Sequence, residues 1–197
     1  MHLEAKYFLD YVKRTFPEYF INKKVLDVGG GDINGNNKLY FFNCEYNSND
    51  VVDAPNVTIV SKTKDLPFSN YFDTIISSDC FQHDAEYKQS ILKIYEMLKP
   101  NGLFFFTCAS TGRNEHGTIA TSPGDSYATL ANIENFRDYY YNLTINDINN
   151  VINLNKSFSY WQSYYNSFTK DLYFIGIKNN DFIDYQYINV IKTTNDI

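Results

Sequence analysis

The stretch that decides the fold is Lys24-Val25-Leu26-Asp27-Val28-Gly29-Gly30-Gly31-Asp32. Its first five residues have the length and apolar character of a short buried strand, and the three glycines end that strand. Glycine at a strand end lets the backbone approach a ligand closely and adopt a positive φ. The stretch therefore predicts a first strand followed by a ligand-binding loop.

Strand and helix patterns alternate on both sides of this loop. The expected strands are residues 24–28, 44–48, 57–61, 72–78, 103–108, 158–165 and 171–178, and the clearest helices are 3–16 and 86–99. Such alternation predicts an α/β fold with a Rossmann-like, doubly wound, mostly parallel sheet of about seven strands. A short turn joins the last two strands, so this C-terminal pair must be antiparallel. We expect one domain over residues 1–197.

Segments outside these elements carry three further predictions. Residues 109–127 are rich in Ser, Thr, Gly and charge and predict a long loop, which in a compact domain is usually functional or disordered. Thr144 is expected to begin a helix with Asp147 in its first turn. Residues after Asn179 are predicted to be a tail or an edge element.

Composition restricts the class of protein. The formal net charge of −6 argues against a chain that follows polyanions, so nucleic acid is a disfavoured partner. Three widely spaced cysteines form neither a disulfide framework nor a zinc motif. No apolar run has the length of a signal peptide core or a bilayer span, so we expect a cytoplasmic protein without membrane contact. The sequence does not decide between a monomer and a homodimer.

The glycine loop is compatible with two kinds of ligand, a dinucleotide such as NAD and a nucleoside without phosphate. A dinucleotide fold requires Gly-x-Gly-x-x-Gly, whereas this chain has Gly29-x-Gly31-x-x-Asn34 and lacks the third glycine. Asp27 inside the strand end suits a cationic ligand better than a pyrophosphate. Asp50, at the end of the second strand, can accept both hydroxyls of a ribose. These features favour S-adenosylmethionine (SAM) over NAD, and a glycine turn that binds nothing remains the third interpretation.

The chain resembles the class I SAM-dependent methyltransferases from about Val25 to Lys178. Four segments carry the resemblance: residues 25–31, Asp50, residues 65–68 with 72–76, and residues 98–103. It implies that the cofactor is SAM, that Asp27, Gly29, Gly30 and Gly31 surround its methionine part, and that Asp50 binds its ribose. Residues 32–37, 80–84, 111–118 and 171–174 resemble a branch of uncharacterised methyltransferases associated with surface-glycan pathways.

Two departures from the family pattern concern the cofactor. The last glycine of the first motif is displaced to Gly35. Where the family often has an acid that binds the adenine amino group, this chain has Lys62-Thr63-Lys64. Lysine has no acceptor, so we expect adenine to be recognised by backbone groups or by Asp79, with Thr63 also in the cofactor site.

Methyl transfer to a hydroxyl requires an aligned acceptor and a base that removes its proton. Histidine is the natural base near neutral pH, and His83 and His116 follow the fourth and fifth strands at the cofactor end of the sheet. The non-catalytic alternatives are that His83 orients its loop or caps the next helix, and that His116 lies on a mobile surface loop. Asp79, His83 and Asp84 do not have a diagnostic metal spacing, so we predict no metal.

Arg113, Glu115 and Tyr127 are the expected acceptor-binding residues, because they can hold hydroxyls, anionic groups and a sugar ring. We therefore predict a SAM-dependent O-methyltransferase for a sugar hydroxyl in a glycan or nucleotide-sugar pathway. The alternatives are a methyltransferase for another small molecule or a nucleic acid, and a catalytically silent SAM-fold subunit that supports a partner.

Overall fold

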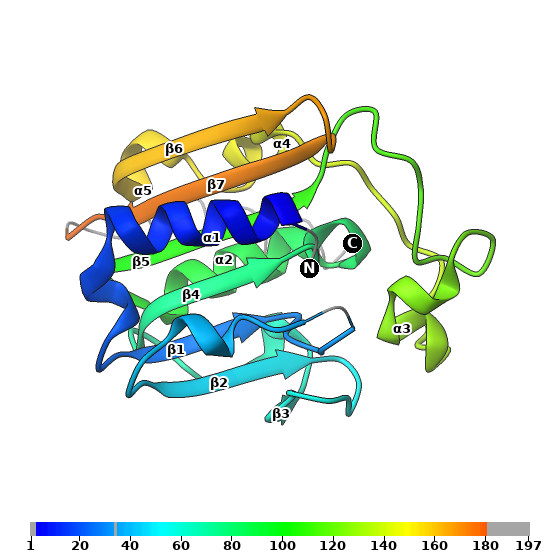
Figure 1. The fold of residues 1–197 in the computed structure, drawn as a ribbon, viewed down its shortest axis with the longest axis horizontal. Coiled ribbons are helices and arrows are strands. Elements are labelled where there is room, and N and C mark those ends of the chain that lie inside the picture. The colour runs from blue at the N-terminus through cyan, green and yellow to red at the C-terminus, as the bar shows by residue number, and fades with distance from the viewer. Residues whose placement is uncertain (1–2, 34, 181–197) are drawn as a thin grey trace, which may run out of the picture.

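The computed structural model describes residues 3–33 and 35–180. Their strands form one seven-stranded sheet in the order β3-β2-β1-β4-β5-β7-β6 (Figure 1). The strands are β1 (Lys24–Val28), β2 (Glu45–Asp50), β3 (Ile59–Val60), β4 (Phe72–Ser78), β5 (Leu98–Ala109), β6 (Phe158–Asn166) and β7 (Asp171–Lys178). All neighbours from β3 to β5 are parallel, and β7 is antiparallel to both β5 and β6. The predicted Rossmann-like architecture and its C-terminal antiparallel pair are confirmed.

Helices cover both faces of this sheet. They are α1 (Leu3–Thr15), α2 (Tyr87–Met97), α3 (Tyr127–Leu130), α4 (Ile145–Val151) and α5 (Leu154–Ser157), with short 3-10 turns η1 (Pro17–Phe20), η2 (Lys38–Tyr40), η3 (Thr63–Asp65), η4 (Phe81–His83) and η5 (Pro123–Asp125). Figure 1 shows α1 on one face and α2, α4 and α5 on the other. None of the helices in residues 3–33 and 35–180 combines the length and the apolar character that a bilayer crossing needs.

The core is divided between the two faces of the sheet. β5 shows this division, because Phe105 packs with Phe8 and Leu9 of α1 whereas Phe104 and Phe106 pack on the face of α2. Side chains alternate along a strand, so a central strand buried on both faces must be apolar throughout. This explains why the run Leu103–Cys108 in the sequence has no alternation.

The end of α2 differs from the prediction. The helix stops at Met97 rather than Lys99, and Leu98 already pairs with Phe72 of β4. Pro100-Asn101-Gly102, which follows the predicted helix and has the composition of a helix stop, lies inside β5, where the register shifts and Asn101 has a φ of 58°. The physical cause is distant in sequence: the buried Lys178 ammonium donates to the carbonyls of Tyr95 (2.7 Å) and Leu98 (2.6 Å).

Smaller differences affect the edge of the sheet and the loops. The second strand runs Glu45–Asp50 rather than 44–48, and the third is reduced to Ile59–Val60. Thr144 begins α4 with a capping box that includes Asp147, as predicted. The predicted tail lies outside the described residues from 181 onward.

The topology brings the site residues to one end of the sheet. Strands β1, β2, β4 and β5 are parallel, so their carboxyl ends and the loops that follow them meet there. The segment after β5 leaves this end, forms α3 away from the sheet and returns to α4 (Figure 1). The predicted long loop is therefore an excursion that faces the ends of the strands.

Candidate functional site

A pocket of about 290 Å³ lies at the carboxyl ends of the strands. Its walls come from the glycine loop, the ends of β2 and β5, η3, the segment from β4 into α2, the long loop and α3. All the predicted site residues line this pocket except Glu115. The structure therefore brings the expected cofactor and acceptor residues together in one cavity.

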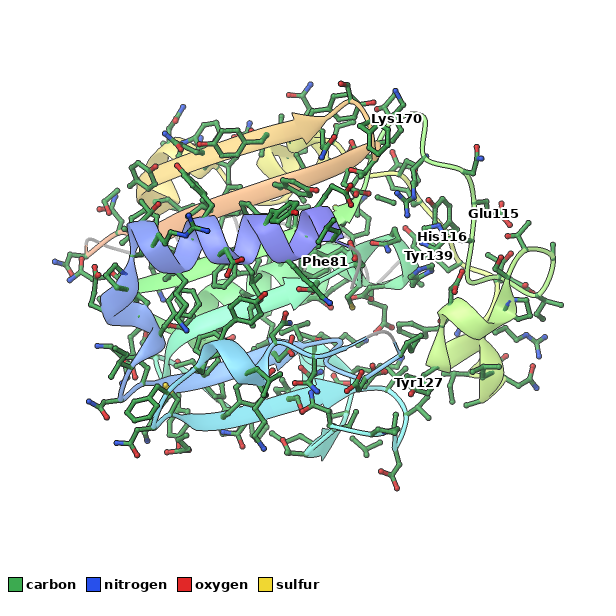
Figure 2. All side chains as sticks on the ribbon, viewed as in Figure 1. Phe81, Glu115, His116, Tyr127, Tyr139 and Lys170 are labelled. Carbon is green, nitrogen blue, oxygen red and sulfur yellow. The ribbon has the colours of Figure 1, made fainter. Side chains whose placement is uncertain are left out.

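Glu115 lies on the exposed side of the long loop. Its carboxylate accepts hydrogen bonds from the hydroxyls of Thr118 (2.7 Å) and Thr121 (3.2 Å). Figure 2 places His116 and Tyr139 between the sheet and α3, with Glu115 on the outer side. The geometry assigns Glu115 to holding the turn of this loop rather than to the pocket wall.

The glycines after β1 are required by close packing. A Cβ on Gly30 would lie 2.7 Å from the Ser48 Cβ and 3.0 Å from the Asp27 carbonyl oxygen. Gly29 has a φ of 67°, and a side chain there would overlap Cys80. A Cβ on Gly31 would lie 2.8 Å from the ring of Tyr127. The loop can follow this path between its neighbours only because these residues have no side chains.

The displaced glycine belongs to a turn closed by Asp32. The Asp32 carboxylate accepts hydrogen bonds from the Gly35 N–H and the Asn36 amide, both at 2.7 Å. Gly35 has a φ of 100° and open space around it. Local hydrogen bonding thus fixes the glycine loop where the family pattern uses a further glycine.

Asp27 is a buried carboxylate at the end of β1. Asn37 donates to both of its oxygens at 3.0 Å, and the Tyr46 hydroxyl donates to Oδ2 at 2.5 Å. Burial raises the pKa of Asp27 to about 6, although both donors act in the opposite direction. A positive charge in the pocket would favour the ionised carboxylate.

Asp50 is the last residue of β2 and faces the same pocket. The Val51 N–H donates to its Oδ1 at 2.7 Å. Burial raises the pKa of Asp50 even though backbone N–H groups, including that of Gly31, stabilise its charge. Each carboxylate oxygen can accept more than one hydrogen bond, so Asp50 retains acceptor capacity for ligand hydroxyls.

The two lysines around Thr63 share a partner that the sequence reading missed. Nζ of Lys62 and Nζ of Lys64 lie 3.1 and 3.2 Å from Oε1 of Glu86, the N-cap residue of α2. Thr63 itself is buried and accepts a hydrogen bond from Asn49 (3.1 Å). The sequence around residues 62–64 gave no signal for this contact, because Glu86 lies 24 residues from Lys62 along the chain.

His83 and His116 meet at one wall of the pocket. Their ring centroids are 5.0 Å apart, and Tyr140 lies 5.6 Å from His83 and 5.0 Å from His116. Burial, together with the neighbouring His116, lowers the pKa of His83 to about 4, although a hydrogen bond to the Tyr139 backbone opposes this shift. The His83 Nδ1 is buried and has no hydrogen-bond partner among the described residues. His83 is therefore a neutral imidazole with an unused nitrogen.

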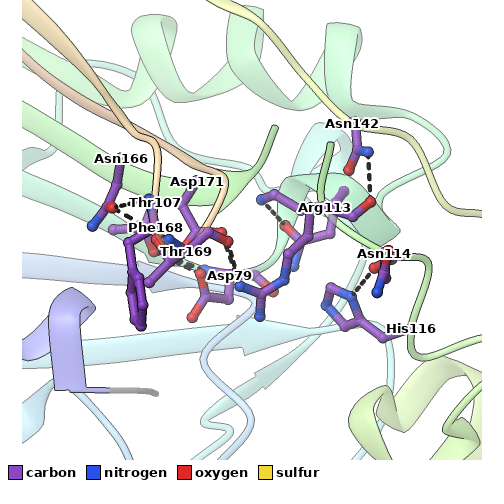
Figure 3. Close-up of polar contacts among 12 residues, drawn as sticks. Asp79, Thr107, Arg113, Asn114, His116, Asn142, Asn166, Phe168, Thr169 and Asp171 are labelled. Carbon is purple, nitrogen blue, oxygen red and sulfur yellow. Dashed lines mark hydrogen bonds and ion pairs between the residues drawn. The ribbon is translucent and has the colours of Figure 1, made fainter. Parts of the chain in front are cut away.

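Arg113 is anchored beside His116, as Figure 3 shows. Its guanidinium donates to the Thr169 carbonyl at 2.6 Å and lies 3.6 Å from the buried carboxylate of Asp171. Asn142 donates to the Arg113 carbonyl at 2.9 Å. The β6–β7 turn thus fixes the position of Arg113, and part of its donor capacity is already used inside the protein.

Asp79 and Tyr127 complete the walls. Asp79 has a φ of 53°, and the Thr107 hydroxyl donates to its Oδ1 at 3.0 Å. The Tyr127 hydroxyl donates to the Asp32 carbonyl at 2.8 Å, which holds the start of α3 against the glycine loop. In the part of the chain that the structure describes, no group of three or more His, Cys, Asp and Glu is arranged to hold a metal ion.

Comparison with known proteins agrees with this geometry. Residues 26–106 match a family profile described as a methyltransferase domain. The sequence matches no curated protein. The structure is similar to Burkholderia thailandensis 1,6-didemethyltoxoflavin-N1-methyltransferase, solved with 1,6-didemethyltoxoflavin and S-adenosylhomocysteine; the TM-score is 0.58 at 16% identity, over 87% of this chain and 76% of that chain.

Two further solved structures show the same fold. Haemonchus contortus phosphoethanolamine N-methyltransferase 2, solved with SAM, has a TM-score of 0.61 at 17% identity, over 89% of this chain and 53% of that one. The CurJ carbon methyltransferase has a TM-score of 0.55 at 14% identity, over 82% of this chain and 50% of that one. The chain thus spans about half the length of these two proteins. Residues 26–106 are thus similar to methyltransferase domains, and the chain has the fold of these solved methyltransferases.

Proposed function

We propose that this chain binds SAM and transfers its methyl group to a hydroxyl of a sugar in a glycan or nucleotide-sugar pathway. The observation that carries the proposal is a single pocket with the glycine loop and Asp50 on one side and a neutral, buried His83 on the other. Methyl transfer needs the donor and the acceptor in one cavity with a base beside the acceptor.

The charge of the pocket fits this cofactor. Among the described residues its lining contains seven carboxylates (Asp27, Asp50, Asp79, Asp84, Glu86, Asp125 and Asp171) but only two permanent cations, Lys62 and Arg113. Buried carboxylates favour a cationic ligand, and SAM carries a sulfonium and an amino group. Asp27, Gly29, Gly30 and Gly31 would hold its methionine part, and Asp50 its ribose hydroxyls. Bound SAM supplies an activated methyl group on sulfur.

The chain's own residues would then position and deprotonate the acceptor. His83 is neutral at pH 7 because burial lowers its pKa to about 4, so its imidazole could accept the hydroxyl proton as the oxygen–carbon bond forms and the sulfur–carbon bond breaks. His116 and Tyr140 pack against the His83 ring and fix its orientation. The excess of carboxylates in the lining favours a neutral sugar of a glycan over a nucleotide sugar, whose diphosphate is anionic.

The same charge supports an amine acceptor as the second candidate. A protonated amine would be attracted to the pocket, and a neutral base such as His83 could remove its proton before transfer. In both cases Arg113 would contact the acceptor, because it lines the pocket near His116.

The test begins with calorimetry of SAM and S-adenosylhomocysteine, with NAD as the control ligand. Micromolar binding to the wild-type chain and its loss in Asp50→Ala would support the cofactor assignment, whereas no binding at millimolar ligand would refute it. The acceptor test measures transfer of a labelled methyl group to neutral sugars, nucleotide sugars and amines. A sugar product whose formation falls at least about a hundredfold in His83→Ala would support the proposal, since a general base contributes roughly that factor or more. Turnover on amines alone would refute the sugar assignment.

A further inference from the structure

The two outer strands of the sheet are protected from further pairing to very different degrees. β3, at one edge, has only two residues, Ile59–Val60, whereas β6, at the other edge, has nine, Phe158–Asn166. β6 pairs with β7, and no other strand among the described residues pairs with its outer side (Figure 1). A long edge strand presents unpaired N–H and C=O groups, to which another strand can bind.

The sequence of β6 does not have the features that keep most edge strands unpaired. Proteins usually protect such a strand with charged side chains, with proline or with a bulge that twists it away. The nine residues of β6 include no charged residue and no proline. Its register shifts only at its beginning, between Phe158 and Tyr160. The segment from Tyr160 to Asn166 is therefore a regular, neutral strand whose outer edge can accept a partner strand.

Aromatic side chains continue this edge onto the face of the sheet that α1 covers. The ring centroids of Phe16 and Tyr160 are 5.7 Å apart, and those of Tyr11 and Tyr164 are 6.4 Å apart. The Tyr164 hydroxyl donates to the Gln162 side chain, as expected for alternate residues that share one face of a strand. Tyr11 and Tyr164 nevertheless remain 44% and 41% exposed. Partly exposed tyrosines beside an open strand edge are typical of protein–protein interfaces.

The pattern of β6 is complementary to itself. When two copies of the strand pair antiparallel about a two-fold axis at Gln162, Tyr160 of each copy lies opposite Tyr164 of the other, on the α1 face. Gln162 then lies opposite its own equivalent, and an amide can both donate to and accept from another amide. Aromatic pairs across neighbouring strands stabilise antiparallel pairing.

Charge also favours a second copy at this edge. The chain has a formal net charge of −6, which opposes association of two copies wherever their acidic surfaces meet. β6 itself is uncharged, and α1, which contacts it through Tyr11, carries three basic residues and two acidic ones. Two copies that meet along β6 therefore bring no like charges together within the paired strands.

We infer that the outer edge of β6 is a homodimer interface, in which it binds β6 of a second copy of this chain, antiparallel and with Gln162 on the two-fold axis. The two seven-stranded sheets then form one continuous sheet, and the same surface of each copy takes part, as a two-fold contact requires. This inference goes beyond the proposed function and does not depend on which cofactor or acceptor the pocket binds.

Charged substitutions at Gln162 test both the interface and its register, because the axis places this residue opposite itself. Gln162→Lys brings two ammonium groups together and Gln162→Glu two carboxylates. Each variant alone should dimerise at least about tenfold more weakly than the wild type, since like charges that face each other across an interface cost that factor or more. An equal mixture of the two variants should recover the dimer, because opposite charges then face each other. The control Val60→Lys adds a charge to the other edge strand, at a side chain that is 56% exposed, and should leave association unchanged.

The experiment is analytical ultracentrifugation of the full chain at roughly 1 to 100 µM, a range that covers the Kd of a modest interface. The wild type and Val60→Lys should approach the mass of two chains, each Gln162 variant should shift toward the mass of one, and the mixture should return to two. Circular dichroism and thermal melting establish that each variant is folded. A wild-type chain that stays monomeric at the highest concentration would overturn the inference. A dimer that neither Gln162 variant weakens, or a mixture that stays monomeric, would overturn it as well, because the interface would then lie elsewhere or have another register.

Discussion

Replacing Asp27 by Asn should stabilise the empty protein near neutral pH while weakening SAM binding. The folded-state pKa of Asp27 is about 6, against 3.8 for an unperturbed aspartate, because burial penalises its charge. An acid with a raised folded pKa binds its proton more tightly in the folded state than in the unfolded state. Its contribution to stability is therefore complete below pH 3.8 and is lost as the pH rises through 6.

The magnitude follows from the pKa difference. One pKa unit corresponds to 1.36 kcal/mol, so ionised Asp27 lowers the free energy of unfolding by up to about 3 kcal/mol at pH 7. An amide removes this penalty but loses an acceptor, since Asn37 donates to both carboxylate oxygens. A lost neutral hydrogen bond offsets about 1 kcal/mol. The expected net gain is about 1–2 kcal/mol at pH 7.5, or a rise of several degrees in Tm.

The assay is chemical denaturation of the wild-type chain and Asp27→Asn at pH 4.5 and pH 7.5, with ligand binding measured in parallel. The stability difference should be present at pH 7.5 and shrink or vanish at pH 4.5, where Asp27 of the folded wild type carries its proton. The variant should bind SAM more weakly, because a negative charge facing the cationic ligand is gone. A variant less stable than wild type at pH 7.5, or a difference independent of pH, would refute the argument that burial dominates this carboxylate.

Three further predictions test the packing around the pocket and the core. Gly30→Ala should lose about 1–3 kcal/mol of unfolding free energy in denaturant titrations because its Cβ would meet Ser48 and the Asp27 backbone, whereas Gly124→Ala, with no atom within 4 Å, should be neutral. Lys178→Met should lose about 2 kcal/mol or more of unfolding free energy, because two buried carbonyls lose their donor. Burial lowers the pKa of Lys178 to about 8 in the folded chain. The wild type should therefore gain stability relative to this variant as the pH rises from 8 to 10.5. Tyr127→Phe keeps the ring on Gly31 but removes the hydrogen bond to Asp32, so stopped-flow measurements should show faster release of S-adenosylhomocysteine with less than about 1.5 kcal/mol lost in stability. An unchanged release rate would mean that this contact does not hold the pocket closed.

The parts of the fold that were predictable are those whose cause is local in the sequence. The bounds of β1, β4 and β7 were predicted correctly, because each is a short run of apolar and β-branched residues between turn residues. The end of α2 was not predictable, because the donor that satisfies its last carbonyls is Lys178, far away along the chain. Lys99-Pro100-Asn101-Gly102 has the composition of a helix stop, and only strand pairing with β4 decides that the segment belongs to the sheet.

In the candidate site too, features with a local cause in the sequence were predictable, whereas those that depend on distant residues were not. Gly29 and Gly31 line the pocket as expected, because a glycine run after a buried strand has a physical meaning by itself. Glu115 was predicted from its charge, but whether a loop carboxylate faces a pocket depends on its neighbours. Here the Glu115 carboxylate accepts a hydrogen bond from the Thr118 hydroxyl. Arg113 lines the pocket as expected, yet its bond to the Thr169 carbonyl joins segments 56 residues apart and could not be inferred from the sequence.

Lys62 and Lys64 show why the absence of the family's adenine-binding acid does not by itself predict a loss of SAM binding. In the sequence they remove the expected acceptor for adenine, and weak SAM binding would follow if each position acted alone. In the folded chain α2 brings Glu86 to these lysines, so the carboxylate is present at the same wall of the pocket but comes from another element. Because Lys62 and Lys64 share one carboxylate oxygen, the charge of the three residues together is +1 rather than +2. The composition of this wall, rather than the identity of residue 62, is therefore what should determine the affinity for adenine.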